Sequence, residues 1–148
     1  NSSTAAQAAA NLFPSSTLLN GQGDALRHAY FNALNASDVN PAIAKLFSDA
    51  HESEVPSILK LEKNMDILNN AIGNQIGSSM PGASDQAILN AVLTQFNAGA
   101  MWHISPLNHT TSRRYDGNGD GVQDCSTCLN GILPTSKLIP SNQTAASQ

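Results

Sequence analysis

The chain has 148 residues and a mass of 15.5 kDa, which is the size of a single domain. Apolar residues make up 41% of it and charged residues only 12%, about half the charged fraction of an ordinary soluble domain. Seven basic side chains against 11 acidic ones give a formal charge of −4. No basic stripe is available to neutralise phosphates, which excludes an ordinary nucleic-acid binder. No apolar run approaches the roughly 20 residues of a membrane-spanning helix.

Helical periodicity is the main signal in the first half of the chain. Residues 4–12 are rich in Ala and predict a short helix that Pro14 stops. A turn over 20–23 leads to a second helix over 24–35, where apolar residues recur at helical spacing. Asn40 and Pro41 form an N-cap and a first helical position, so a third helix is expected from there to His51.

Two further helices are expected before residue 100. The longest opens at Pro56 and fades at Gly77, with apolar residues every three or four positions. Ser84 is the N-cap of the fifth helix, whose buried face carries Ile88, Leu89, Val92, Leu93 and Phe96.

After Trp102 the composition changes to Pro, Ser, Thr, Asn and Gly without a sustained period. No strand-like alternation of useful length is found, so the sequence predicts an all-α fold: a bundle of about five helices with an irregular, calcium-stabilised C-terminal arm. The expected division is a helical bundle over 1–104, the irregular arm over 105–138 and a tail or linker over 139–148.

Residues 116–124 read D-G-N-G-D-G-V-Q-D and have the ligand spacing of a calcium loop. Oxygen-bearing side chains fall at loop positions 1, 3, 5 and 9, Gly121 stands at position 6, and position 7 offers a backbone carbonyl. The expected Ca²⁺ ligands are Asp116, Asn118, Asp120, Val122 through its carbonyl, and Asp124. The loop resembles the calcium motifs of dockerins and thrombospondin type 3 repeats.

The loop departs from an EF-hand at position 12, where Thr127 replaces the bidentate Glu. Affinity is therefore expected to be weak unless a distant carboxylate completes the shell. Millimolar extracellular Ca²⁺ would still fill a weak site. The alternative is a solvated Asp/Gly turn without metal.

Cys125 and Cys128 follow the loop directly. The favoured interpretation is a local disulfide, because the scarcity of charges and abundance of Asn, Ser, Ala, Gln and Thr favour a secreted or cell-surface protein. A zinc half-site with His103 or His109 is the alternative. A redox role is disfavoured because no βαβ pattern surrounds the pair.

Three of the predicted helices carry polar residues at positions where packing of the core does not require them. Asp24 and His28 stand four apart, beside Arg27, and Asp66 with its neighbours keeps three- and four-residue spacing. Clusters of this kind on facing helices build metal and acid–base sites. The residues involved are Asp24, Arg27, His28, Asp49, His51, Glu52, Asp66, Asn69 and Asn70.

Three sequence blocks contain these residues: G-D-A-L-R-H-A-Y-F-N-A-L over 23–34, A-K-L-F-S-D-A-H-E over 44–52, and M-D-I-L-N-N-A-I-G over 65–73. They resemble an uncharacterised all-α bacterial family of secreted and polymorphic-toxin-associated domains. Its signature is D-A-x-R-H-A, then D-A-H-E, then M-D-x-x-N-N-x-x-G. The resemblance covers roughly residues 20–78 and implies no activity. Phe31 stands at or beside the usual Trp.

Two interpretations of the polar residues remain open. Either His28, His51, Glu52 and Asp66 form a catalytic or Zn²⁺-binding centre, or they join Asp24, Arg27, Asp49, Asn69 and Asn70 in a buried hydrogen-bond network. The first makes the protein a small metal-dependent hydrolase or toxin-like effector. The second favours a secreted, calcium-binding module of the cell surface or extracellular space, with self-assembly or a surface partner. No G-x-S-x-G or H-E-x-x-H motif is present.

Overall fold

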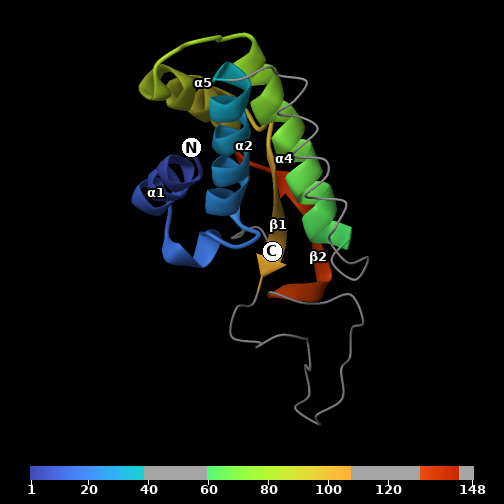
Figure 1. Cartoon of the computed structure of the whole chain (residues 1–148). Helices are drawn as coiled ribbons and strands as arrows, with labels where there is room; N and C mark the ends of the chain where they lie inside the picture. The colour runs from blue at the N-terminus through green and yellow to red at the C-terminus, as the bar shows by residue number, and fades with distance from the viewer. Residues whose placement is uncertain (39–59, 108–130, 144–148) are drawn as a thin grey trace.

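The computed structural model of the chain describes residues 1–38, 60–107 and 131–143 (Figure 1). In chain order, its elements are α1 (Ser2–Leu12), a short 3₁₀ helix η1 (Ser15–Thr17), α2 (Gln22–Asp38), α4 (Lys60–Ser78), α5 (Asp85–Asn97), β1 (Trp102–Leu107) and β2 (Ile132–Pro140). In these three ranges, no helix has both the length and the apolar character needed to cross a bilayer.

The helices predicted at the start of the chain, at 24–35, before Gly77 and after Ser84 are confirmed in the described residues. Helix α1 ends at Leu12, two residues before Pro14. Ser84 is the N-cap of α5, and its hydroxyl oxygen accepts a hydrogen bond of 3.2 Å from the amide of Ala87. The helix predicted from Asn40 to His51 lies outside the described residues.

The prediction of an all-α fold is wrong, because β1 and β2 pair as an antiparallel two-stranded sheet. The register places Trp102 opposite Pro140 and Ile104 opposite Leu138. The fold is therefore mixed α/β, and the boundary expected at residue 104 falls inside β1. The arm expected to be irregular contains the end of β1 and most of β2, and β2 continues into the expected tail.

The strands escaped detection because their burial does not alternate. Alternation of apolar and polar residues marks a strand with one buried face. In β1, His103, Ile104 and Ser105 are all buried, so a polar residue stands at an interior position on each side of Ile104. Pro106 and Pro140 further weaken the strand signal.

Helix α2 lies at the centre of the molecule (Figure 1). Helices α1, α4 and α5 and strand β1 all pack against it. The hydroxyl of Tyr30 on α2 donates a 3.0 Å hydrogen bond to the carbonyl of Asp85 at the start of α5. The largest side chains of the common core are Leu26, Leu34, Tyr30, Met65, Ile88, Val92, Phe96, Met101, Ile104 and Ile132.

Helices α2 and α4 approach each other closely along two glycines of α4. A Cβ atom built on Gly73 would lie 2.1 Å from the carbonyl oxygen of Ala29, and one on Gly77 would lie 2.0 Å from that of Ala33. Contact positions rise together along both chains, so the two helices run parallel. The same register brings the preceding turns of α2 and α4, which carry the polar residues, against each other.

Candidate functional site

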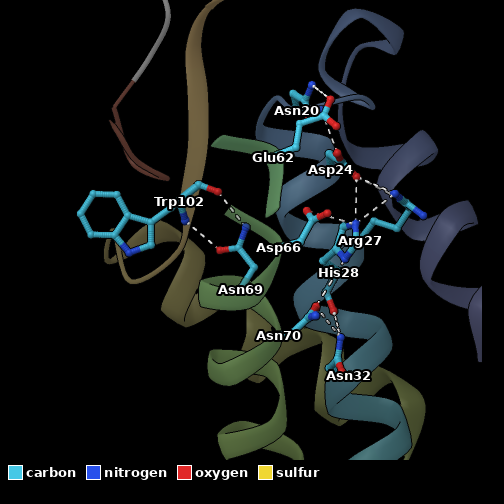
Figure 2. Close-up of polar contacts among 10 residues, drawn as sticks. All are labelled: Asn20, Asp24, Arg27, His28, Asn32, Glu62, Asp66, Asn69, Asn70 and Trp102. Atoms are coloured by element: carbon cyan, nitrogen blue, oxygen red, sulfur yellow. Dashed lines mark hydrogen bonds and ion pairs between the residues drawn. The ribbon is translucent and has the colours of Figure 1, made fainter. Parts of the chain in front are cut away.

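The polar side chains of α2 and α4 meet in one cluster near the start of α2 (Figure 2). On α2, Asp24, His28 and Asn32 are spaced by four residues and share one face. On α4, Asp66 and Asn70 have the same spacing and face them. Two helical faces with one period thus supply Asp24, Asn32, Asp66 and Asn70 around His28.

The centre of the cluster is the Nε2 atom of His28. It lies 3.3 Å from Oδ1 of Asp66 and 3.6 Å from Oδ1 of Asp24. The Asp24 side chain is 4% exposed, whereas those of His28 and Asp66 are 16% and 18% exposed. One ligand atom from each of the three residues lies within 4.8 Å of the other two. Within the described ranges, this triad of Asp24, His28 and Asp66 is a group whose ligand atoms lie close enough together to hold a metal ion.

Two amides fix the other side of the imidazole ring. Nδ1 of His28 lies 3.3 Å from Oδ1 of Asn70, and the same oxygen accepts a 2.8 Å hydrogen bond from Nδ2 of Asn32. Asn32 Nδ2 also donates to the carbonyl of His28, at 2.9 Å. A hydrogen bond between Oδ1 of Asn70 and the ring needs the proton on Nδ1 of His28. In neutral His28, the lone pair on Nε2 therefore points toward the two carboxylates.

Arg27 supplies the positive charge next to this pair of carboxylates. Its Nη2 atom lies 2.6 Å from Oδ1 of Asp24, and its Nε atom lies 3.2 Å from the same oxygen. Nη2 is also 3.3 Å from Nε2 of His28. The Arg27 side chain remains 41% exposed, so the cluster opens to solvent on the side of this guanidinium.

Asn20 anchors the buried end of the cluster. Its backbone amide donates a 2.8 Å hydrogen bond to Oδ2 of Asp24, which resembles one half of a capping box at the start of α2. The Asn20 side chain donates to Oε1 of Glu62 on α4, and its carbonyl accepts a 2.8 Å bond from Ile104 on β1. Asn20 has φ of 64°, a left-handed conformation that Asn tolerates better than most residues. The Asp24 carboxylate is consequently held in one orientation.

Asn69 points to the opposite side of α4 and serves the sheet (Figure 2). Its Oδ1 accepts from the amide of Trp102 at 2.9 Å, and its Nδ2 donates to the Trp102 carbonyl at 2.8 Å. The amide side chain thus replaces a strand partner for one residue of β1 and fixes the hairpin to α4. Asn69 is structural, while Asn70 belongs to the His28 cluster.

His103 on β1 is buried away from the cluster. Its Nε2 atom lies 2.9 Å from the carbonyl oxygen of Gln143. Burial lowers the pKa of His103, and nearby backbone carbonyls of Gln143, Pro140 and Ile104 offset part of that effect. The alternative zinc half-site with Cys125, Cys128 or His109 cannot be placed, because those residues lie outside the described residues.

The structure brings Asp24, Arg27, His28, Asp66 and Asn70 together among the residues singled out in the sequence. Outside the described residues lie Asp49, His51, Glu52, the calcium-loop ligands Asp116, Asn118, Asp120, Val122 and Asp124, and the cysteines Cys125 and Cys128. The sequence analysis missed Asn20, Asn32 and Glu62. Four-residue spacing was the available signal for two of them, since 24-28-32 and 62-66-70 are continuous polar series on α2 and α4.

The comparisons with known proteins place this site within a family of undescribed activity. No curated protein and no solved structure matches the chain. A family model described as "Domain of unknown function (DUF6973)" matches residues 1–100. That range contains the whole His28 cluster and ends just before β1. The chain therefore belongs to the DUF6973 family of domains of unknown function.

Proposed function

We propose that this domain is a small metal-dependent hydrolase whose divalent ion is held by Asp24, His28 and Asp66. The observation that carries the proposal is the orientation of the His28 ring. Its Nδ1 is directed to Oδ1 of Asn70, and its Nε2 faces two carboxylate oxygens at 3.3 and 3.6 Å. Metal-binding histidines commonly donate their second ring N–H to a carbonyl or carboxylate oxygen in this way.

A lone pair that faces two carboxylates is repelled by both of them. A cation at Nε2 relieves this repulsion, and Nη2 of Arg27 at 3.3 Å, a proton or a metal ion can each supply the positive charge. Ligand atoms about 2.0–2.2 Å from a tetrahedral Zn²⁺ ion lie about 3.3–3.6 Å from one another. The two distances from Nε2 of His28 agree with that spacing.

Three protein ligands leave a position open on a four-coordinate ion. A bound ion would lower the pKa of water at that position and would supply a nucleophile for hydrolysis of an ester, amide or phosphate bond. His51 or Glu52, which the sequence places in the same set of polar residues, is proposed as the general base for this water or, on an ion with more than four ligands, as a further ligand.

The competing explanation is a structural network in which His28 is an imidazolium ion between the two carboxylates. Metal analysis of the purified full-length protein separates the two explanations. We expect wild-type protein to bind one equivalent of Zn²⁺ in a calorimetric titration, and the variants His28→Gln and Asp66→Asn to lose that binding. Asp85→Asn removes an exposed carboxylate on α5 and is the matched control that retains it.

Activity is measured as zinc-dependent release of p-nitrophenol from p-nitrophenyl acetate and p-nitrophenyl phosphate. Loss of turnover in Asp66→Asn with a nearly unchanged melting temperature would support a metal centre. A wild-type protein that binds no divalent ion, and whose His28→Gln variant unfolds at much lower temperature, would establish the structural network instead.

We also propose that the segment between the strands is a calcium-stabilised loop, in a secreted bacterial domain that acts as a binding or structural module at the cell surface. The pairing of Leu107 with Ile132 supports this, because the D-G-N-G-D-G-V-Q-D sequence lies in the connection closed by that pair. Long connections without a core of their own gain order from a bound ion. Chelation of Ca²⁺ should expose residues 113–130 to limited proteolysis while helical circular dichroism stays nearly unchanged; an identical digestion pattern would refute the loop.

A further inference from the structure

We infer that Arg27 neutralises Asp24 while the proposed metal site is empty. When the divalent ion binds, the Arg27 side chain leaves Asp24 and then binds an oxyanion of the substrate. This inference rests on the proposed function and assigns a substrate class to the same site. Its basis is the position of one guanidinium nitrogen, Nη2, which lies within 3.3 Å of ligand atoms from two of the three metal-binding residues.

The Arg27 guanidinium and a metal ion would compete for the same carboxylate oxygen, Oδ1 of Asp24. Nη2 lies 2.6 Å from that oxygen and 3.3 Å from Nε2 of His28, and Nε takes a second bond of 3.2 Å to the same oxygen. The other carboxylate oxygen of Asp24, Oδ2, accepts from the amide of Asn20. An ion that binds Oδ1 and Nε2 must therefore displace the guanidinium.

The surroundings of Arg27 allow this displacement. Its side chain is 41% exposed, whereas Asp24 is 4% exposed and is fixed from the opposite side by Asn20. The long, flexible arginine can move toward solvent while the buried carboxylate stays in place. The cluster itself is thus retained in both states, and only the positive partner changes.

The exchange changes the charge presented to a ligand. Among the described residues, and with neutral His28, Asp24 and Asp66 contribute −2 and Arg27 contributes +1, which gives −1 for these contacting groups. A divalent ion raises that total to +1 and releases Arg27 at the exposed edge of the site. Metal binding therefore precedes anion binding, and an anionic oxygen is attracted only to the loaded site. A guanidinium next to a metal ion binds phosphate or carboxylate oxygens in bidentate geometry.

The test compares zinc binding to wild-type protein, Arg27→Gln and Arg27→Lys by calorimetry. Removal of the competing cation should tighten Zn²⁺ binding by about tenfold or more in Arg27→Gln, because a charge-assisted hydrogen bond no longer has to be broken. Arg27→Lys keeps a positive charge and should bind with intermediate affinity. Lys137→Gln removes one positive charge from β2 and should match wild-type protein.

The second arm measures binding of phenylphosphonate and benzoate to the zinc-loaded proteins. Wild-type protein should bind at least one of them, and the preferred probe tells a phosphate ester from a carboxylate substrate. Arg27→Gln should bind that probe at least about tenfold more weakly than wild-type protein does. Without zinc, neither probe should bind.

The outcomes separate this inference from the proposed function. Equal zinc affinity in wild-type protein and Arg27→Gln would overturn the role of Arg27 and leave the metal site intact. Undiminished probe binding by zinc-loaded Arg27→Gln, or no binding of either probe to loaded wild-type protein, would overturn the assignment of the substrate class. Absence of zinc binding in every form would refute the metal site itself.

Discussion

Substitution of Gly73 by Ala tests the close approach of α2 and α4 on which the whole cluster depends. The added Cβ would lie 2.1 Å from the carbonyl oxygen of Ala29 and 2.8 Å from its carbonyl carbon. An ordinary contact between carbon and a carbonyl oxygen needs about 3.3 Å, so the helices must separate locally by about 1 Å. No side-chain rotation relieves the contact, because both atoms belong to the backbone of α2.

The expected loss of stability is the difference between two opposing effects. Overpacking of this kind costs about 1–3 kcal/mol, and a contact with backbone belongs at or above the upper end of that range. The change from Gly to Ala within a helix returns about 1 kcal/mol. The net loss is therefore about 2 kcal/mol, which corresponds to a fall of about 4–8 °C in Tm for a chain of this length.

The assay is thermal unfolding followed by circular dichroism, together with zinc titration. Ala71→Gly is the control with the reverse exchange at an exposed position of α4. It should lower the free energy of unfolding by about 1 kcal/mol through helix propensity alone. Separation of the helices should also weaken zinc binding, because His28 and Asp66 lie on opposite helices. Ala29→Gly should not rescue the variant, since the carbonyl oxygen remains. A Gly73→Ala protein with a raised Tm would refute the close packing and the placement of Asp66 against His28.

The remaining predictions concern the anchors of the fold. Asn69→Ala should lower the free energy of unfolding by about 2 kcal/mol or more, because both backbone groups of Trp102 lose their partners. The measurement is urea denaturation, with Asn64→Ala at an exposed position of α4 as the control. Equal effects of the two substitutions would contradict the role of Asn69 as an anchor of β1. Ser84→Ala should cost about 1 kcal/mol through loss of the α5 cap, and an unchanged Tm would argue against it. Because the pKa of His103 is lowered in the folded protein, the unfolded chain binds more protons than the folded protein does once the pH falls to about 6.5, the ordinary pKa of histidine. Stability should therefore decline between pH 7 and the depressed pKa, and His103→Gln should show a smaller decline in Tm; an identical pH profile would contradict the assignment.

The helices were accessible from the sequence because their signals are local. Pro14 and the Ser84 cap act within one turn of chain, and the apolar period of α4 reports the face that it buries. The same period placed Asp24 beside His28, and Asp66 near Asn70, before any packing was known. Half of the cluster on each helix was therefore predictable.

The pairing of these two halves was decided by tertiary structure alone. Gly73 and Gly77 carry no side chain, so the depth at which α2 sits against α4 depends on backbone atoms of Ala29 and Ala33. The four-residue spacing of small residues on each helix permits this close approach, but it does not specify which helix is the partner. That depth brings Nε2 of His28 to two carboxylates from different helices, Asp24 on α2 and Asp66 on α4.

The pairing of β1 with β2 was likewise decided by the tertiary structure. Trp102 and Pro140 are partners across a long stretch of chain, and neither segment identifies the other as its partner. His103, Ile104 and Ser105 are all buried, so β1 lacks the alternation of apolar and polar residues that marks a strand with one buried face. The sequence alone determined where the helices begin and end and which of their positions carry charge. Which of these charges meet was settled by the tertiary structure, because the distance between two side chains on different segments depends on how those segments pack.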